Sequence, residues 1–105
     1  MRAIDLYSGV GGWSLGLRLA GVEVVASYER WGPANETYFK NNLHQAQTVD
    51  IRRLTFAELP KDIDIVVGSP PCTQFSFSNR GGSGDIDDGL EDIVRFLGVV
   101  EHLRP

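Results

Sequence analysis

The sequence predicts a doubly wound α/β fold with a mainly parallel sheet. Short apolar runs alternate with helix-like segments, and a glycine-rich turn over residues 8–12 directly follows the first apolar run. The run over residues 22–28 is almost continuously apolar, as is typical of a parallel strand that is covered on both faces. Right-handed crossovers and short connections then favour the strand order 3-2-1-4, with ligands at the carboxyl ends of the strands.

The predicted elements follow one another along the whole chain. They are strands over residues 2–7, 22–28, 47–49 and 63–67, helices over residues 13–20, 33–42 and 90–103, and a weak helical turn over residues 55–59. Gly21 ends the first helix, and Pro33 lies in the favoured first turn of the second. The first helix is apolar nearly all round with only Arg18 charged, so we expect it to be buried on more than one side.

The last predicted helix has an apolar stripe, and a long loop precedes it. The stripe consists of Leu90, Ile93, Phe96, Leu97, Val100 and Leu103. Residues 79–89 include four glycines and no large aromatic side chain, so we expect this segment to be poorly ordered. The strand over residues 63–67 would lie at an edge of the sheet, and its unpaired backbone groups predict self-association as a homodimer.

Composition and charge exclude several classes of protein. The 105 residues are 42% hydrophobic and 23% charged, as in ordinary soluble chains that form one domain. No apolar run reaches the ~18 residues that span a bilayer, so we expect a soluble, cytoplasmic protein without membrane contact. One cysteine and two histidines are too few for a disulfide framework or a Cys/His zinc site, and we expect no metal. The net charge of −4 argues against nucleic-acid binding through bulk positive charge.

Three strand ends carry residues that suit a nucleoside ligand. Gly9 and Gly11 follow the first strand, and they allow the close backbone approach that such a ligand needs. Their spacing departs from the dinucleotide fingerprint. Glu29 closes the second strand, where a carboxylate can accept hydrogen bonds from both ribose hydroxyls, and Asp50 closes the third, where it could accept an adenine amino proton. Taken singly, each feature is more typical of a plain turn or a solvated strand end, but together they favour a ligand.

Cys72 is the candidate nucleophile. Most free cysteines are small buried apolar residues. This one follows Pro70 and Pro71 at the end of the fourth strand and precedes a polar continuation, which predicts a rigid, exposed turn beside the ligand. Arg80 could lower the pKa of the thiol.

These residues resemble the DNA (cytosine-5) methyltransferases. The segment over residues 5–17, Asp-Leu-Tyr-Ser-Gly-Val-Gly-Gly-Trp-Ser-Leu-Gly-Leu, is similar to the S-adenosylmethionine motif of that family. The segment over residues 68–76, Gly-Ser-Pro-Pro-Cys-Thr-Gln-Phe-Ser, is similar to its catalytic loop. The resemblance implies a Rossmann-like fold, S-adenosyl-L-methionine as cofactor with S-adenosyl-L-homocysteine as product, and double-stranded DNA as partner.

The resemblance also assigns roles to individual residues. The implied catalytic residues are Cys72 and Pro71. The implied cofactor-binding residues are Tyr7, Ser8, Gly9, Val10, Gly11, Gly12, Trp13, Glu29, Arg30, Trp31, Asp50, Ile51, Ser69 and Pro70. The implied DNA-binding residues are Gln74, Ser76, Ser78 and Arg80.

The chain departs from the family pattern in three places. Arg30 stands where the family often has an aromatic residue after the ribose acid, although Trp31 follows. Thr73 replaces the usual glutamine after the cysteine. An arginine usual before the last helix is missing, with Asp87 and Asp88 in that stretch.

The family's Glu-Asn-Val motif and its target-recognition domain would lie beyond residue 105. We therefore expect residues 1–105 to form the N-terminal part of a class I methyltransferase catalytic domain, incomplete at its C-terminal side. Such a chain would be a fragment or a split subunit that is inactive alone and needs a second polypeptide. Two alternatives stay open: a non-catalytic binding partner with the same fold, or a dinucleotide-dependent oxidoreductase, against which the glycine spacing and the Pro-Pro-Cys loop argue.

Overall fold

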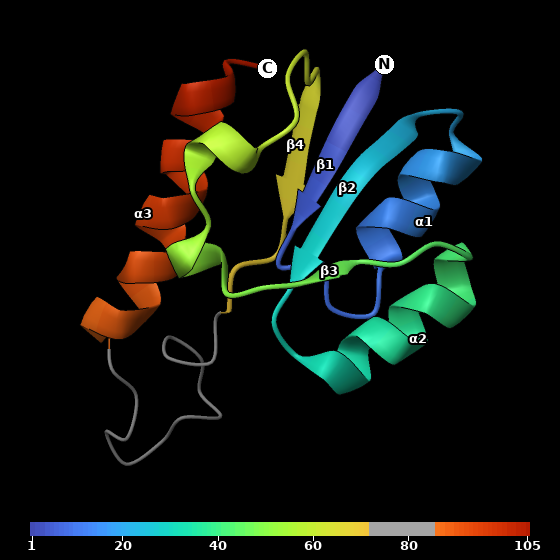
Figure 1. The fold of residues 1–105 in the computed structure, drawn as a ribbon, viewed down its shortest axis with the longest axis horizontal. Helices are drawn as coiled ribbons and strands as arrows, with labels where there is room; N and C mark the ends of the chain where they lie inside the picture. Colours follow the sequence, from blue (N-terminus) through green and yellow to red (C-terminus); the bar gives the residue numbers. More distant parts are fainter. Residues whose placement is uncertain (72–85) are drawn as a thin grey trace.

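A four-stranded parallel sheet forms the centre of the structure, a computed structural model that describes residues 1–71 and 86–105 (Figure 1). The strands are β1 (Arg2–Leu6), β2 (Glu23–Glu29), β3 (Gln47–Thr48) and β4 (Ile65–Gly68). Their order, β3-β2-β1-β4, confirms the predicted one, and every pairing is parallel.

Helices cover both sides of this sheet. They are α1 (Gly12–Leu19), α2 (Gly32–Asn42) and α3 (Ile86–Leu103), together with the 3-10 turns η1 (Ile51–Arg53) and η2 (Phe56–Glu58). Figure 1 shows α1 and α2 on one side and α3 with the two turns on the other. The doubly wound arrangement predicted from the sequence is therefore confirmed. None of the described helices is long and apolar enough to cross a membrane.

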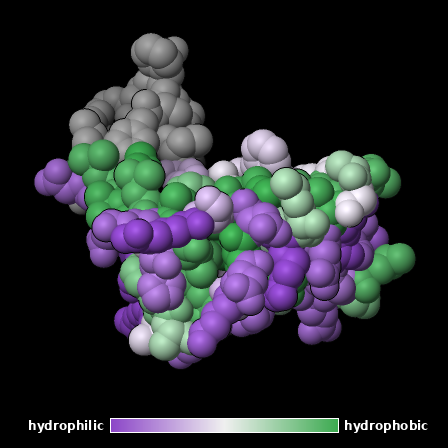
Figure 2. Space-filling view, turned by 90° about the horizontal axis from the view of Figure 1, so that it is seen from above, coloured by the Kyte–Doolittle hydropathy of each residue, from purple (hydrophilic) through white to green (hydrophobic). Residues whose placement is uncertain are grey.

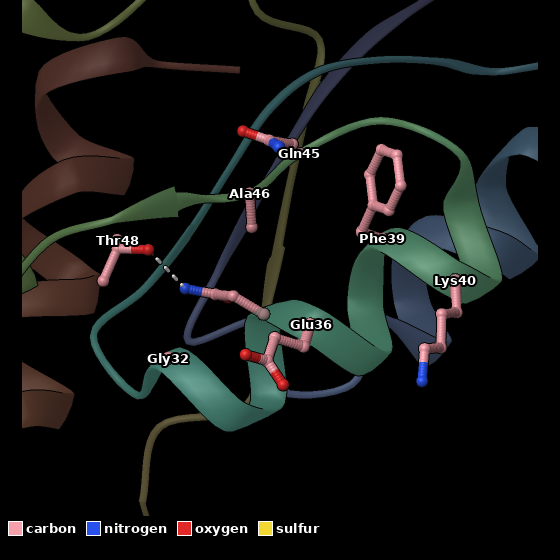
Figure 3. A pocket seen from close by; sticks show the side chains of 8 residues that line it. Gly32, Glu36, Phe39, Lys40, Gln45, Ala46 and Thr48 are labelled. Atoms are coloured by element: carbon pink, nitrogen blue, oxygen red, sulfur yellow. Dashed lines mark hydrogen bonds between the residues drawn. The ribbon is translucent and has the colours of Figure 1, made fainter.

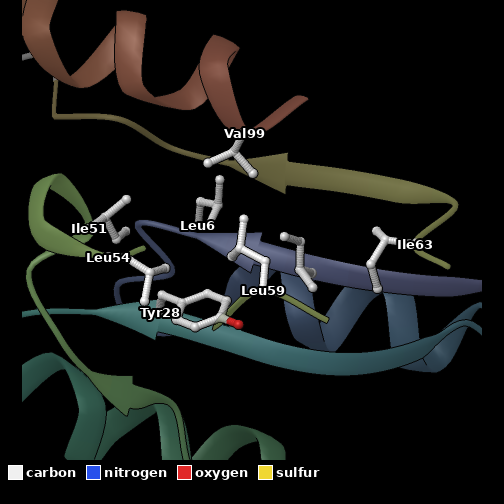
Figure 4. Packing of buried hydrophobic residues seen from close by; sticks show 8 residues of the cluster. Leu6, Tyr28, Ile51, Leu54, Leu59, Ile63 and Val99 are labelled. Carbon is white, nitrogen blue, oxygen red and sulfur yellow. The ribbon is translucent and has the colours of Figure 1, made fainter. Parts of the chain in front are cut away.

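The two sides of the sheet differ in chemistry. The side facing α3 holds the apolar core, drawn in Figure 4: Ile4, Leu6, Tyr28, Ile51, Leu54, Leu59, Ile63 and Val99. Because side chains alternate along a strand, the neighbours Asp5 and Ser27 face the other side, where Ser14 of α1 and Tyr38 of α2 meet them through hydrogen bonds. The layer under α1 and α2 is therefore built around buried polar groups.

The burial predicted for the first helix is wrong in the described structure. Ser14 is the buried residue of α1, whereas Trp13 and Leu19 are 54% and 80% exposed. The helix is eight residues long and packs on β2 through its polar Ser14 side. No described element covers its outer side, so its apolar residues stay exposed.

The last helix also differs from its prediction. It begins at Ile86 rather than Leu90, so Asp87 and Asp88 lie in its first turn, where acidic side chains are favourable. The rest of the segment expected to be poorly ordered, residues 79–85, lies outside the described residues.

The predicted stripe of this helix is wrong for two members. Leu90 and Leu97 are 43% and 59% exposed, while Val99 is fully buried and Asp92 is 7% exposed. The helix is turned so that Asp92 meets Arg52 and Val99 enters the core. An ion pair therefore helps to set its rotation.

Apolar side chains remain on the surface. On the face drawn in Figure 2, apolar surface gathers in more than one place beside hydrophilic surface. The exposed large apolar residues are Met1, Val10, Trp13, Leu15, Leu19, Trp31, Phe39, Leu43, Leu90, Val94 and Leu97. Three of them, Leu90, Val94 and Leu97, are spaced as neighbours along one side of α3.

Candidate functional site

Two adjoining hollows lie at the carboxyl ends of the strands. The larger, about 570 Å³, is lined by Tyr7, Ser8, Gly9, Val10, Gly12, Trp13, Glu29 and Ser69. The smaller, about 70 Å³, is lined by Tyr7, Glu29, Arg30, Val49, Asp50, Ile51, Ser69, Pro71 and Asp92. Tyr7, Glu29 and Ser69 line both, so the two hollows share a wall.

Most residues that the sequence assigns to a cofactor line this pair of hollows. The exceptions are Gly11, Trp31 and Pro70, which lie in the same loops without lining either hollow. Pro71, predicted to be catalytic, lines the smaller hollow. Cys72 and the predicted DNA-binding residues lie outside the described part of the chain; these DNA-binding residues are Gln74, Ser76, Ser78 and Arg80.

The glycine turn after β1 is held in a tight conformation. Gly11 N–H donates to the Ser8 carbonyl at 2.9 Å, and Ser8 N–H donates to the Tyr28 carbonyl at 3.0 Å. Gly11 has φ of 90°, and a Cβ there would clash with Asn42 and Tyr38 of α2. Only glycine fits this position, because both the backbone angle and the neighbouring helix exclude a side chain.

Glu29 joins the glycine turn to the end of β2. Its Oε1 accepts a hydrogen bond from Gly9 N–H at 3.1 Å, and its Oε2 accepts one from Trp31 N–H at 3.0 Å. Each carboxylate oxygen can accept a further hydrogen bond. The side chain is therefore fixed in place and still able to accept hydrogen bonds from a diol.

Asp50 is fixed at the next strand end. Its Oδ1 accepts a hydrogen bond from Arg52 N–H at 3.1 Å, which caps the turn η1. Its Oδ2 lies 3.9 Å from Arg53 Nε, and the side chain is 35% exposed. An acceptor thus faces the smaller hollow, next to the buried Ile51.

An acidic side chain that sequence reasoning missed, Asp92 of α3, completes the smaller hollow. It accepts two hydrogen bonds from Arg52, at 2.9 and 2.8 Å, and one from the Tyr7 hydroxyl at 2.9 Å. Burial acts to raise the pKa of Asp92, but the hydrogen bonds from Arg52 and Tyr7 and the Arg52 charge hold it below its usual range. Burial and the hydrogen bond to Asp92 raise the pKa of Tyr7.

A second missed group lies between β1 and α1. Asp5 is fully buried, and its Oδ2 accepts a hydrogen bond from Ser14 Oγ at 2.7 Å. The chain of contacts continues from Ser14 to Ser27 at 3.1 Å, from Ser27 to the Tyr38 hydroxyl at 2.6 Å, and from Tyr38 to His44 Nε2 at 2.8 Å. Burial raises the pKa of Asp5 to about 6, although the hydrogen bonds from Ser14 act against that rise.

A separate hollow of about 430 Å³ lies between α2 and β3 (Figure 3). It is lined by Gly32, Asn35, Glu36, Phe39, Lys40, Gln45, Ala46 and Thr48. None of the residues predicted to act in a site lines it. The hollows at the strand ends, where several fixed acceptors and a glycine turn meet, are the better candidate site.

Comparison with known proteins shows the family of the chain. The family model for C-5 cytosine-specific DNA methylase matches residues 1–105. The type II methyltransferase M.HindV of Haemophilus influenzae is 38% identical over 109 residues, which cover the whole chain and 35% of that protein. M.HgiGI of Herpetosiphon aurantiacus, also a type II methyltransferase, is 39% identical over 93 residues, or 86% of the chain and 70% of that protein.

Two solved structures of methyltransferases are similar to the chain in fold. A putative DNA modification methyltransferase encoded within an Escherichia coli prophage has a TM-score of 0.74 at 30% identity, over the whole chain and 30% of that protein. The Dnmt2 methyltransferase of S. pombe has a TM-score of 0.72 at 26% identity, again over the whole chain and 30% of that protein. The chain thus spans about a third of the length of M.HindV and of these two solved proteins. It belongs to the C-5 cytosine-specific DNA methylase family.

Proposed function

We propose that this chain binds S-adenosylmethionine in the two adjoining hollows and supplies Cys72 as the nucleophile for methylation of cytosine carbon-5 in double-stranded DNA. The observation that carries the proposal is the meeting of the glycine turn, Glu29 and Asp50 around one space, with Pro71 at its wall. Family membership supports the same chemistry. The relatives named above are methyltransferases by name.

The residues present fit the cofactor. Glu29 is fixed by two backbone N–H groups and can accept hydrogen bonds from the ribose hydroxyls. Asp50 can accept one from the adenine amino group. The first turn of α1 has backbone N–H groups without helical partners, and Gly12 and Trp13 of that turn line the larger hollow, where they suit the carboxylate of the methionine part.

The chemistry explains why a thiol belongs beside this pocket. Cytosine carbon-5 is a weak nucleophile, and a bond from the Cys72 sulfur to carbon-6 makes it reactive. The bound cofactor supplies an electrophilic methyl group. Once carbon-5 carries the methyl group, a base takes the carbon-5 proton. The electron pair of that bond restores the double bond between carbon-5 and carbon-6, and the Cys72 sulfur leaves as a thiolate. The cytosine must leave the helical stack, since the thiol attacks the face of its ring.

Cofactor binding is tested first, by calorimetric titration with S-adenosylhomocysteine and, in parallel, with NAD. We expect S-adenosylhomocysteine to bind and Glu29→Ala to weaken it roughly 10- to 150-fold, as for the loss of hydrogen bonds to a charged acceptor. Glu36→Ala is the control, because Glu36 is an exposed glutamate that lines only the hollow between α2 and β3. Equal affinity of the Glu29 and Glu36 variants would remove Glu29 from the site.

Methyl transfer is tested with labelled cofactor and DNA. The net charge of −4 disfavours strong DNA binding by these residues alone, so we expect no transfer by the 105 residues alone. We expect transfer when a second polypeptide supplies the remaining family motifs, and loss of transfer in Cys72→Ser. Robust transfer by the 105 residues alone would refute the expectation of a split or partial enzyme, and activity of Cys72→Ser would refute the role of the thiol.

A further inference from the structure

The Arg52 side chain donates all of its hydrogen bonds to acceptors within the described structure. A guanidinium has five N–H donors, and each has an acceptor here. Nε and Nη2 donate to the two carboxylate oxygens of Asp92, and Nη2 also donates to the Asp88 carbonyl at 2.8 Å. Nη1 donates to Asp88 Oδ1 at 2.9 Å and to Glu91 Oε2 at 3.2 Å. Arg52 thus holds the first turns of α3 in one orientation.

The same contacts extend to the wall of the candidate cofactor pocket. Asp92, whose side chain is 10% exposed, accepts a third hydrogen bond from the Tyr7 hydroxyl. Tyr7 lines both hollows, and its φ of 55° is unusual for a residue other than glycine. Such a conformation costs free energy and persists only when surrounding contacts fix it. The hydrogen bond to Asp92 is one such contact.

A second arginine, Arg95, connects α3 back to the turn η1. Arg95 of α3 donates from Nε to the Ile51 carbonyl at 2.8 Å, and its guanidinium lies 4.5 Å from the centre of the Phe56 ring. Ile51 belongs to η1 and lines the smaller hollow. Arg52 of the turn thus bonds to the helix and Arg95 of the helix bonds to the turn, and both elements contribute to the lining of the smaller hollow.

We propose that Arg52, Asp92 and Tyr7 form one positioning unit, which couples occupancy of the cofactor pocket to the orientation of the first turns of α3. The inference rests on the proposed function, since it needs a ligand in that pocket. A ligand in the smaller hollow meets Tyr7, Asp50 and Asp92 together. It therefore favours the arrangement in which Tyr7 bonds to Asp92 and Arg52 holds the helix.

Two conservative variants test the unit. Tyr7→Phe keeps the ring and removes only the hydroxyl that reaches Asp92. Arg52→Lys keeps the charge and loses the two-pronged contact. Arg53→Lys is the matched control, because the neighbouring Arg53 has an 88% exposed side chain and only a 3.9 Å contact with Asp50.

S-adenosylhomocysteine affinity is measured by calorimetry for each variant and for the double variant. We expect Tyr7→Phe and Arg52→Lys each to weaken binding roughly 2- to 13-fold, the equivalent of one hydrogen bond. The double variant should bind S-adenosylhomocysteine with about the same affinity as the single variant that binds it less tightly, because both substitutions break the same unit. If the losses of affinity in the two single variants multiply in the double variant, Tyr7 contacts the ligand independently of Arg52, and the inference would be overturned.

Hydrogen exchange supplies a readout that a purely structural role would not move. Saturating S-adenosylhomocysteine should slow exchange of the backbone amides of residues 90–95 several-fold in the unmodified protein and in Arg53→Lys. It should leave them unchanged in Tyr7→Phe. Equal protection in Tyr7→Phe would overturn the coupling alone, whereas no binding by the unmodified protein would overturn both the proposed function and this inference.

Discussion

The buried carboxyl of Asp5 makes the stability of the fold depend on pH. In the folded protein its pKa is raised from 3.8 to about 6, chiefly by burial. A carboxyl with a raised folded pKa binds its proton more tightly in the folded state. The free energy of unfolding therefore falls as the pH rises from about 4 to about 6, and it stays lower above that range. The difference between the two pKa values corresponds to about 3 kcal/mol.

The substitution Asp5→Asn isolates this effect. The amide imitates the protonated carboxyl, since it is neutral and keeps an oxygen that can accept the hydrogen bond from Ser14. We expect wild type and variant to be about equally stable at pH 4. At pH 7.5 the variant should be more stable by up to about 3 kcal/mol, because it has no buried charge to maintain.

The assay is urea unfolding at a series of pH values, followed by far-ultraviolet circular dichroism. Asp62→Asn is the control, since Asp62 is an exposed aspartate in a turn with φ of 59°, which asparagine also tolerates. A constant difference between Asp5→Asn and wild type across pH 4–7.5 would refute the reasoning. Asp92 affects the free energy of unfolding in the opposite direction from Asp5. Because the pKa of Asp92 is lowered in the folded protein, its ion pair stabilises the fold at neutral pH, and this stability is lost only as the pH falls below about 4.

Three further outcomes are expected. Gly11→Ala should lower the free energy of unfolding by about 2–4 kcal/mol, measured by urea unfolding, because Gly11 has a left-handed backbone and a Cβ there would clash with α2. Gly12→Ala is the control: its Cβ would meet nothing within 4 Å, so it should lower the free energy of unfolding by less than about 1 kcal/mol. Gly68→Ala should also cost more than about 1 kcal/mol, because its Cβ would lie 2.5 Å from the Leu6 carbonyl oxygen. The protein should sediment as a dimer at micromolar concentration, through the edge strand β4 or the exposed side of α3; a stable monomer would contradict this expectation.

The strand order and the candidate site could be predicted because their signals are local. Gly9 lies in a glycine turn after the first strand, and Glu29 and Asp50 are single acids at the ends of the next two. The carboxyl ends of parallel strands lie at the same edge of a sheet, so these three residues come together there without any contribution from the rest of the chain. The register of β1 with β2 then brings Glu29 to the Gly9 backbone. The sequence pattern alone was enough for this part.

The missed features depend on contacts between distant segments. Asp5 lies inside an apolar run, and its spacing does not show that Ser14 will donate a hydrogen bond to it and link it to Ser27. Asp92 is 40 residues from Arg52, and an acid on a helix is usually solvated. The ion pair helps to set the rotation of α3, so the apolar stripe alone misplaced Leu90 and Leu97 and did not reveal the burial of Val99.

Backbone amide chemical shifts recorded during titration with S-adenosylhomocysteine test the central claim most directly, because they report both binding and its location. We expect saturable shifts at residues 7–13, 29–31 and 50–51, with the amides of Glu36, Phe39 and Lys40 around the hollow between α2 and β3 unchanged. Shifts confined to that other hollow, or no saturable shifts at all, would contradict the assignment of the strand-end hollows as the cofactor site.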